Sequence, residues 1–452
     1  MSSQNGIEPN SYIIRTFGCQ MNVHDSEHIA GVLEEAGYSR AANVGEAEII
    51  IFNTCCVRES AEDKVWGNLS AIQSDDTSRL VAVCGCMAES HGHKIIERSP
   101  VVDIVFGLDS LKRLPELIRR SRNGSICDLG DRDRASLDAV PSIQVRRLRA
   151  WVPVSYGCDN RCSYCVVPYV RGKERSRSPE AILSEVESLV GRGAVEVTLL
   201  GQNVNSYGRD LCPRASFAEL LRSVASVPGI RRVKYETSHP RDLTDDILTV
   251  MAEMPQVCEH LHLPVQSGSD RVLEAMNRGH DRLFYIDRVR KAREMVKDLV
   301  ISTDIIVGFP GETEADFSDT LDLVDAVGFD SAFMFIYSRR EGTPAAEMAD
   351  EVPAEVKSER FMRLSRLQDI KTSQSLGRLL GRSVELMVEG SARRGDYVVG
   401  RTRGNQVVLL PAGEAHVDSL VVAEVQKVGR HAARGEVREV LQACCPGRLS
   451  KG

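Results

Sequence analysis

The sequence lacks the features that would send the chain into or across a membrane. None of its apolar runs approaches the roughly 18 residues that a membrane span needs, so no transmembrane segment is expected. Its first residues, MSSQNGIEPN, do not have the basic and then apolar order of a signal peptide, which predicts a cytoplasmic protein. Its 13 cysteines are odd in number and occur in a long chain, which favours metal binding or catalysis over a disulfide framework.

The composition is that of a folded globular protein, and its charge is unevenly distributed. The chain has 452 residues, of which 42% are hydrophobic and 27% charged, a length that suggests roughly three domains. The net charge is −7, yet residues 144–177 carry +6 and residues 376–452 carry +4, which leaves −17 for the remainder. A polyanion could bind the two basic segments, although an Arg-rich stretch can equally be solvated surface.

Three regions differ in their patterns and together predict an α/β protein. Residues 11–127 alternate short apolar runs with helical spacing, which is typical of a doubly wound parallel sheet. Residues 144–373 repeat this alternation in six strand–helix units and predict a partial (β/α)6 barrel. Residues 376–442 contain four short apolar runs separated by glycine-containing turns, which predict a small all-β barrel of a kind that often binds nucleic acid.

One cysteine group is local in the sequence. Cys158, Cys162 and Cys165 have the spacing C-x3-C-x2-C directly after the first predicted strand of the central region. Three thiolates on one short loop can hold three irons of a [4Fe–4S] cluster and leave the fourth iron open. A zinc site normally needs a fourth protein ligand, and the loop contains no further Cys or His. The spacing therefore predicts an iron–sulfur site.

A second cysteine group is spread over the first region. Cys19, Cys55 and Cys86 each follow a predicted strand, and the carboxyl ends of parallel strands meet at one edge of a sheet. We therefore expect these three residues to converge, although any single cysteine is more commonly a core residue. Cys56 and Cys84 lie nearby, and the pattern alone does not choose between them and their neighbours.

Six motifs in order resemble one enzyme family. The segments TFGCQMN, NTCCVRE, GCMAE, YGCDNRCSYC, HLPVQSGS and IVGFPGE resemble the radical S-adenosylmethionine (SAM) methylthiotransferases of the MiaB type. The resemblance covers nearly the whole chain and implies that its C-terminal region is a TRAM domain, which binds RNA. It also implies two [4Fe–4S] clusters per chain, an auxiliary one on Cys19, Cys55 and Cys86 and a radical SAM cluster on Cys158, Cys162 and Cys165. Cys56 and Cys84 then have no role as ligands.

The resemblance further implies a reaction and its partners. The enzyme would convert N6-dimethylallyladenosine (i6A) at tRNA position 37 to its 2-methylthio form, with SAM as both methyl donor and radical source. Its expected partners are the anticodon loop of tRNA and an electron donor such as flavodoxin or ferredoxin, with no membrane, and the chain is expected to be a monomer. No catalytic side chain is expected beyond the cluster ligands.

Positions beside the predicted strands suggest further contacts. Residues expected to contact SAM are Gly201, Gln202, Asn203, Ser267, Thr303 and Asp304. Basic residues expected to contact RNA are Arg171, Lys173, Arg175, Arg177, Arg393, Arg394, Arg401 and Arg403. The first four of these basic residues could instead bind the SAM carboxylate or form a solvated surface.

Two other functions remain open at this point. One is methylthiotransfer to a different substrate, either threonylcarbamoyl-adenosine in tRNA or an aspartate of a ribosomal protein. The Gln-Met-Asn that follows Cys19 and the HLPVQSGS segment resemble the i6A branch instead. The basic C-terminal region favours RNA over a protein substrate. The other, from a different class, is a non-catalytic metal-binding RNA protein, which would have no need of six cluster cysteines.

Overall fold

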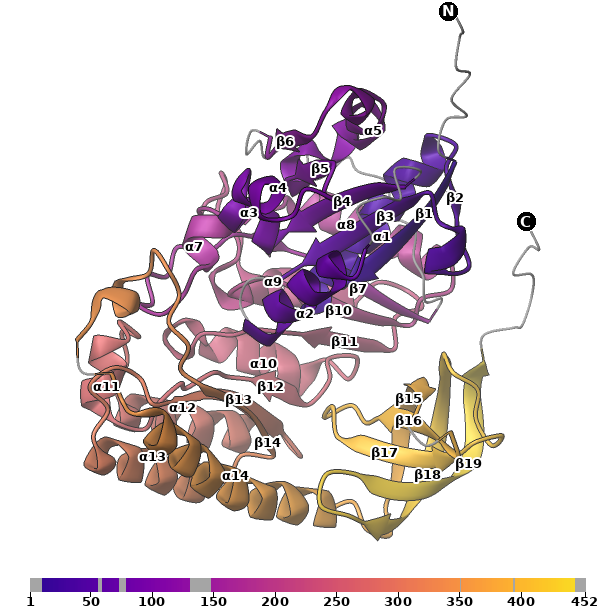
Figure 1. Ribbon diagram of the computed structural model, residues 1–452. Coiled ribbons are helices and arrows are strands. Elements are labelled where there is room, and N and C mark those ends of the chain that lie inside the picture. The colour runs from indigo at the N-terminus through magenta and orange to yellow at the C-terminus, as the bar shows by residue number, and fades with distance from the viewer. Residues whose placement is uncertain are drawn as a thin grey trace, which may run out of the picture. The chain divides into compact units, whose positions relative to one another are not determined.

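The computed structural model describes residues 10–55, 59–72, 79–130, 148–349, 351–392 and 395–443 (Figure 1). By internal contacts the chain divides into two units, which are described separately. The first unit comprises Met1–Val145, Tyr156–Asn160 and Cys165–Arg177, and the second comprises Arg146–Ser155, Arg161–Tyr164 and Ser178–Gly452. The segment from 158 to 165 therefore contributes residues to both units.

The first unit is built on a six-stranded, all-parallel sheet with the order β2-β1-β3-β4-β5-β6. Its strands are β1 (Ser11–Thr16), β2 (Ser39–Arg40), β3 (Ile49–Thr54), β4 (Leu80–Gly85), β5 (Ile104–Phe106) and β6 (Ile126–Asp128). The central strand β3 is buried along its whole length, because helices cover both faces of the sheet. A continuous apolar run such as IIIF is typical of this position.

Two hydrophobic cores lie on opposite faces of this sheet. The helices of the unit are α1 (Gln20–Glu35), α2 (Glu59–Ser70), α3 (Cys86–His91), α4 (Lys94–Arg98), α5 (Leu114–Arg120) and α7 (Val167–Val170). Ile49 and Ile51 of β3 pack in the core covered by α1 and α5, whereas Ile50 and Phe52 pack in the core covered by α2, α3 and α4. This alternation fixes which side chains at the strand ends are turned into the core and which are not.

The second unit contains the six strands expected of the central region. They form two parallel three-stranded sheets, with the orders β11-β10-β7 and β12-β13-β14, and a parallel bridge between Val233 and Val257 connects β11 to the residues that enter β12. These strands are β7 (Arg149–Pro153), β10 (Glu196–Leu200), β11 (Arg232–Tyr235), β12 (His260–His262), β13 (Val300–Val307) and β14 (Ser331–Ile336). Two further strands are short: β8 (Ser155–Tyr156) lies where the chain passes from the second unit to the first, and β9 (Arg175–Ser176) belongs to the first unit.

Helices follow the strands of this partial barrel and cover one face of its sheets. They are α8 (Pro179–Gly191), α9 (Phe217–Ala225), α10 (Asp245–Glu253), α11 (Asp270–Ala275), α12 (Arg282–Met295), α13 (Glu314–Val327) and α14 (Ala354–Gly377). Several begin at capping residues that the sequence supplies: Ser216 and Glu219 form a capping box on α9, and Asp281 accepts a hydrogen bond from the backbone of Phe284 on α12.

The C-terminal residues of the second unit form a closed five-stranded barrel with the order β15-β16-β17-β19-β18. Its strands are β15 (Ser383–Ser391), β16 (Tyr397–Arg401), β17 (Val407–Pro411), β18 (Ser419–Val428) and β19 (Ala433–Ala443). Buried charges join this barrel to the rest of the unit: the fully buried Arg232 donates to the carbonyl of Thr402 at 2.9 Å, and Arg403 donates to both carboxylate oxygens of Glu259.

The predicted fold class is confirmed in each of its three parts. The predicted strands of residues 11–127 and of the central region recur within a few residues, but β2 and β6 at the sheet edges, the short β9 and β19 of the C-terminal barrel were not expected. These missed strands are two or three residues long or, like β19, rich in charged residues, so they carry no clear hydrophobic alternation. The exact domain limits stay a prediction.

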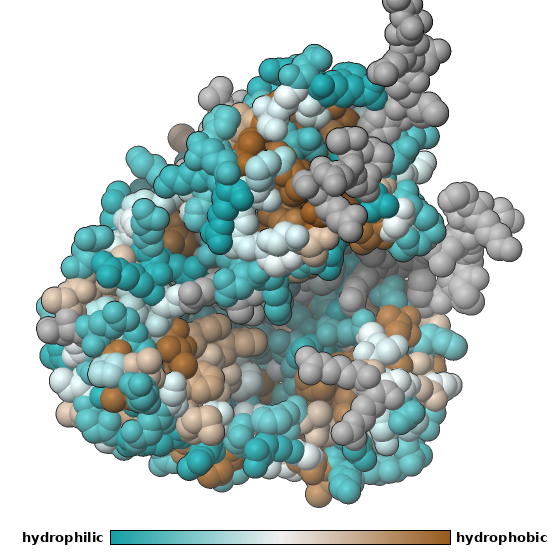
Figure 2. All heavy atoms as spheres, in the orientation of Figure 1, coloured by the Kyte–Doolittle hydropathy of each residue, from teal (hydrophilic) through white to brown (hydrophobic). Residues whose placement is uncertain are grey.

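Among the described residues, no helix is both long enough and apolar enough to cross a membrane. The face shown in Figure 2 is mainly hydrophilic, with hydrophobic residues in scattered groups.

Candidate metal centres

The three N-terminal cysteines lie at one edge of the first unit's sheet. Cys19 caps the N-terminus of α1 after β1, Cys55 directly follows β3, and Cys86 is the first residue of α3 after β4. The strands β1, β3 and β4 are neighbours, and their register places Thr54 beside Gly85, so that Cys55 and Cys86 follow at the same level. The structure thus brings together the three residues that the strand-end pattern had grouped.

Two glycines allow the backbone to pack closely at this edge. A Cβ atom on Gly18, whose φ is +142°, would lie 2.6 Å from Cβ of Cys55. A Cβ atom on Gly85, whose φ is +85°, would lie 2.5 Å from the carbonyl oxygen of Thr54. Both contacts are too short for any side chain, so glycine is required before Cys19 and before Cys86.

A buried amide network supports the turn that carries Cys19. The Asn22 side chain donates to Oδ1 of Asn53 at 3.0 Å and to the carbonyl of Thr54 at 3.3 Å, and Asn53 donates to the Asn22 carbonyl at 2.7 Å. Oδ1 of Asn22 lies 3.5 Å from Sγ of Cys19. Asn22, Asn53 and Thr54 are all completely buried, so these bonds tie the ends of β1 and β3 together. Sequence reasoning missed these residues, although a polar pair that interrupts an apolar strand end is a usable signal.

Cys84 is separated from the cysteine group by strand alternation. Its side chain is fully buried and packs with Tyr12, Ile51 and Phe106 in the core beneath α1 and α5. Burial raises the pKa of the Cys84 thiol well above its ordinary value, which keeps it neutral. Cys84 is therefore a core residue in this structure, whereas Cys56 lies outside the described residues.

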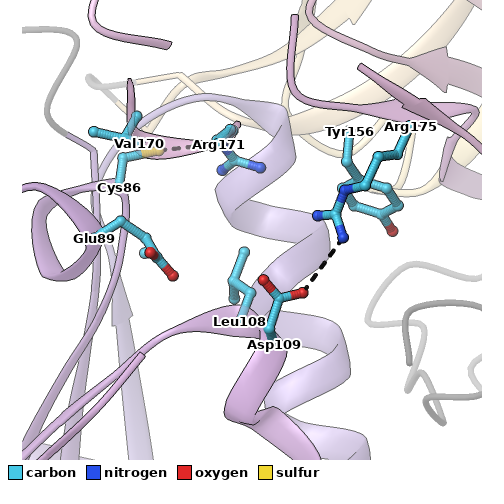
Figure 3. A pocket seen from close by; sticks show the side chains of 9 residues that line it. Cys86, Glu89, Leu108, Asp109, Tyr156, Val170, Arg171 and Arg175 are labelled. Atoms are coloured by element: carbon cyan, nitrogen blue, oxygen red, sulfur yellow. Dashed lines mark hydrogen bonds and ion pairs between the residues drawn. The ribbon is translucent and has the colours of Figure 1, made fainter. Parts of the chain in front are cut away.

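Cys86 accepts a hydrogen bond from a buried arginine. Nε of Arg171 lies 3.2 Å from Sγ of Cys86 (Figure 3). Nη2 of the same guanidinium lies 3.1 Å from Oδ2 of Asp25. The side chains of Arg171 and Asp25 are only 8% and 4% exposed. Burial raises the pKa of Asp25 to about 6, and the Arg171 charge opposes this rise. Burial alone would lower the pKa of Arg171. The neighbouring Cys86 and Asp25 outweigh this effect and raise that pKa well above its usual value.

A pocket opens beside Cys86 within the first unit (Figure 3). It has charged side chains of both signs, and an ion pair of 3.8 Å joins Arg175 to Asp109 at one side. The pocket is lined by Gly85, Cys86, Glu89, Leu108, Asp109, Tyr156, Val170, Arg171 and Arg175. Because Cys86 lines this pocket, a small molecule bound in the pocket would lie next to a predicted cluster ligand.

The central cysteines occupy eight consecutive residues, and their surroundings can be described within each unit. In the first unit, the backbone N–H of Cys158 donates to the Gly172 carbonyl at 3.1 Å. In the second unit, Cys162 is 8% exposed, and Nη1 of Arg278 lies 3.4 Å from its Sγ. Arg278 is itself buried and donates to the carbonyl of Pro264 at 2.8 Å. Sequence reasoning did not identify Arg278.

Both cysteine groups have the donors that iron–sulfur clusters require. Thiolate sulfur is the ligand of [4Fe–4S] clusters, and each group offers three cysteines. Each group also has a buried arginine at one cysteine sulfur, as expected for a negatively charged cluster that is desolvated by protein. The residues present therefore fit a cluster at each place.

The residues expected to contact SAM differ in their environment. Oγ1 of Thr303 donates to the Leu263 carbonyl and accepts from the Val265 backbone, so it connects β13 to the segment after β12. Ser267 is fully buried and its Oγ accepts from the backbone of Ser269. These two hydroxyls have partners within the fold, and their contact with SAM stays a prediction.

The remaining predicted SAM contacts are Gly201, Gln202, Asn203 and Asp304. Asn203 donates to Asp242 at 2.8 Å, while its buried Oδ1 has no hydrogen-bond partner among the described residues. Gly201 and Gln202 precede it after β10. Oδ2 of Asp304 lies 3.5 Å from Nε2 of His262. Asn203 and Asp304 remain predicted SAM contacts, together with Gly201 and Gln202.

The face of the partial barrel opposite its helices is polar. Alternate strand residues such as Val197, Val233 and Ile301 pack against the helices. The intervening positions are Glu196, Thr198, Arg232, Lys234, Glu236, His260, His262, Ser302 and Asp304. Phe333 pairs with Asp304 in the register, makes an edge-to-face contact with His262, and is 52% exposed. Hydrogen bonding and charge from Asp304 raise the pKa of His262 against the effect of burial.

Most of the described basic residues expected to bind RNA have protein partners or are buried. Arg171 pairs with Asp25, Arg175 lies near Asp109, and Arg177 is 7% exposed. Arg401 donates to Glu389 at 2.9 Å, and Arg403 pairs with Glu259. Their placement does not favour phosphate contacts, because these guanidinium groups already serve the fold. Lys173 is exposed and stays a predicted RNA contact, whereas Arg393 and Arg394 lie outside the described residues.

Two protein families match the chain. The Radical SAM superfamily matches residues 152–324, and the uncharacterized protein family UPF0004 matches residues 11–107. The chain is 47% identical over 436 residues to tRNA-2-methylthio-N(6)-dimethylallyladenosine synthase of Acetivibrio thermocellus, covering 94% of this chain and 90% of that protein. It is 45% identical over 434 residues to the protein of that name in Caldicellulosiruptor saccharolyticus, covering 94% and 92%.

Solved structures of low sequence identity share the fold. The radical SAM methyltransferase TsrM from Kitasatospora setae, with cobalamin and a [4Fe-4S] cluster bound, matches with a TM-score of 0.55 and 15% identity, covering 75% of this chain and 77% of that chain. The cobalamin-dependent SAM radical enzyme OxsB matches with a TM-score of 0.52 and 13% identity, covering 80% and 56%. These matches support the fold alone.

Proposed function

The chain belongs to the family of tRNA-2-methylthio-N(6)-dimethylallyladenosine synthases, and we propose from that premise that it adds a methylthio group to carbon 2 of i6A at tRNA position 37. The observation that carries this proposal is the presence of two three-cysteine groups, one spread over three strand ends and one within a single loop. One follows the ends of β1, β3 and β4, and the other occupies the loop after β8. A simple metal-binding RNA protein has no use for two such groups.

The cysteines would hold the two cofactor clusters. Cys19, Cys55 and Cys86 would bind an auxiliary [4Fe–4S] cluster, and Cys158, Cys162 and Cys165 would bind the cluster that chelates SAM. When bound, these clusters and SAM supply the sulfur, the methyl group and the radical that an unreactive aromatic C–H bond requires. Because each group has three cysteines, one iron of each cluster is left for a ligand that is not protein.

The protein's own residues would position the reactants and exclude water. The Asn22–Asn53 network holds the turn of Cys19 against β3, and the Arg171 guanidinium holds the sulfur of Cys86. On the polar face of the partial barrel, Asn203 and Asp304 offer groups for the amino and ribose parts of SAM. The exposed ring of Phe333 offers a stacking surface for an adenine base.

The substrate class follows from the relatives' names, and the remaining partners follow from chemistry. The relatives act on a dimethylallyladenosine of tRNA, and the closed β-barrel of residues 383–443 is an RNA-binding architecture. A radical SAM reaction needs one electron at a time, so a flavodoxin- or ferredoxin-like donor is expected to reduce the enzyme. We expect the chain to act as a monomer in the cytoplasm.

Nucleoside mass spectrometry of tRNA tests this function directly. Cells that lack the protein are expected to accumulate i6A and to lose its 2-methylthio derivative, and the wild-type gene should restore the product. Unchanged 2-methylthio-i6A, with loss of the methylthio group from threonylcarbamoyl-adenosine or from a ribosomal aspartate, would overturn the proposal in favour of another substrate. Anaerobically purified protein should contain about eight irons per chain with matching sulfide, and zinc without sulfide would contradict the cluster assignment.

A further inference from the structure

The segment that follows Cys165 supplies the immediate surroundings of Cys86. Val166 and Val170 pack against Cys86, and Arg171 donates a hydrogen bond to its sulfur. All of these residues lie in the first unit, which includes Cys165–Arg177. The stretch of sequence that begins with a ligand of the central cysteine group thus ends with a donor to the N-terminal group.

The guanidinium of Arg171 makes two directed contacts from one rigid plane. Nε faces Sγ of Cys86 at 3.2 Å, and Nη2 faces Asp25 at 3.1 Å. An arginine side chain is always protonated in proteins, and its planar fork fixes the relative directions of its hydrogen bonds. Asp25 lies on α1, one helix turn beyond Asn22, so the helix that begins at Cys19 also anchors the arginine. Breaking either contact would leave a buried charge without its partner.

We propose that Arg171 is a positioning residue that sets the reduction potential of the auxiliary cluster and that Asp25 limits its effect. A hydrogen bond and a positive charge at a ligand sulfur stabilise the reduced cluster, which carries one more negative charge than the oxidised cluster. The Asp25 carboxylate partly cancels that charge. One electron enters the cluster in this step, and no bond or proton is exchanged. The inference rests on the proposed function only in requiring a cluster on Cys19, Cys55 and Cys86.

The auxiliary cluster can be studied alone in the full chain if the central ligands are removed. In a background with Cys158, Cys162 and Cys165 replaced by Ala, about four irons per chain should remain. The midpoint potential is then measured by electron paramagnetic resonance during titration with dithionite. Iron and sulfide are counted for every variant, so that a change in potential is separated from loss of the cluster. Absence of any cluster in this background would contradict the ligand assignment rather than the role of Arg171.

Three substitutions are expected to shift the midpoint potential by different amounts and in different directions. Arg171→Gln should shift the midpoint to more negative potential by at least a tenfold change in the one-electron equilibrium, which is 59 mV. Arg171→Lys keeps the charge and should recover part of the shift. Asp25→Asn should move the midpoint in the opposite, positive direction. Arg120→Gln is the matched control, because Arg120 is 59% exposed on α5 and pairs only with Glu116 at the surface in the described structure.

The directions of the shifts in midpoint potential show whether Arg171 sets the potential or only supports the fold. An unchanged midpoint in a fully loaded Arg171→Gln protein would overturn the proposal. If Arg171→Gln fails to retain its cluster, Arg171→Lys and Asp25→Asn decide, because structural damage would shift both in the same direction. Shifts of opposite sign would support the proposal, and a common sign or no shift would overturn it.

Discussion

The two cysteine groups have similar neighbours at one sulfur but differ in how their residues are spaced along the sequence. Cys158, Cys162 and Cys165 are neighbours in the sequence, whereas Cys19, Cys55 and Cys86 come from three strand ends. Each group nevertheless receives an arginine N–H at one sulfur, from Arg278 in the central group and Arg171 in the N-terminal group. A local motif needs only its loop to be present, while the distributed group depends on the sheet being assembled in register.

The two arginines differ in their partners. Arg171 donates to a buried carboxylate, Asp25, while Arg278 donates to the Pro264 carbonyl and the Tyr164 hydroxyl. A carboxylate neutralises the guanidinium charge, whereas a carbonyl or phenol only accepts its hydrogen bond. Similar arginine–sulfur contacts are therefore accompanied by different kinds of partner, a carboxylate at Arg171 and a carbonyl and a phenol at Arg278.

The largest expected effect is the loss of the central group. Cys162→Ala is expected to abolish reductive SAM cleavage while leaving about four irons bound at the N-terminal cysteines. The reason is that the N-terminal cysteines follow strand ends of the first unit's sheet, whereas Cys162 lies in the second unit. Production of 5′-deoxyadenosine, measured by chromatography, together with iron content, checks both parts. Full SAM cleavage by this variant would refute the assignment of the central group.

Removing one cysteine of the N-terminal group should have a different effect from removing one of the central group. Cys55→Ala is expected to retain SAM cleavage but to lose formation of methylthiolated tRNA, because sulfur insertion would need the auxiliary cluster. Normal product yield from this variant would remove Cys55 from the site and favour Cys56 in its place.

Cys84→Ala is the matched control for that substitution. Cys84 lies in the same region but packs in the hydrophobic core, so its replacement should retain both clusters and the product. It should cost about 1 kcal/mol of stability through lost packing. Loss of iron from Cys84→Ala would show that the core assignment of this thiol is wrong.

A smaller effect is expected when the ligands are kept and their support is removed. Asn22→Ala removes the side-chain donor to Oδ1 of Asn53 and to the Thr54 carbonyl, both buried, which should cost about 1–3 kcal/mol. Calorimetry should show a lower melting temperature, and iron at the N-terminal group should be lost faster on dilution. Asn68→Ala, at a solvent-exposed hydrogen bond on α2, should change neither quantity. Equal behaviour of the two variants would argue that the turn of Cys19 needs no amide network.

The smallest expected effect concerns RNA binding beside the central cysteines. Lys173 is exposed in a segment whose arginines are mostly buried, so Lys173→Ala should weaken tRNA binding without changing SAM cleavage. If Lys173 contacts one phosphate, the slope of log affinity against log salt should fall by about one unit. An unchanged slope would assign RNA contacts to other parts of the chain.

Charge counting located basic segments correctly but could not say which charges are available. The segment around residues 144–177 and the C-terminal region are both net positive. In the structure, Arg171, Arg401 and Arg403 pair with Asp25, Glu389 and Glu259, each distant in sequence. Such pairing is a property of the folded chain, because a guanidinium meets its carboxylate only after two elements pack.

The sequence by itself determined the fold class, the family and the six candidate cluster ligands. Apolar runs and helical spacing have a local physical cause, and the C-x3-C-x2-C spacing brings three thiols together within one loop. The rule that parallel strands end at one edge brought the N-terminal cysteines together, and the family resemblance chose Cys19, Cys55 and Cys86 over Cys56 and Cys84.

Only the tertiary structure decided which neighbours these cysteines have. The direction of Cys84 follows from strand alternation against two covered faces, and the donors Arg171 and Arg278 approach from residues 85 and 116 positions away. Thr303 and Ser267, which stay predicted SAM contacts, bond to Leu263 and Ser269 within the fold. No local pattern reports such contacts, because hydrogen-bond partners and burial depend on how distant segments pack together.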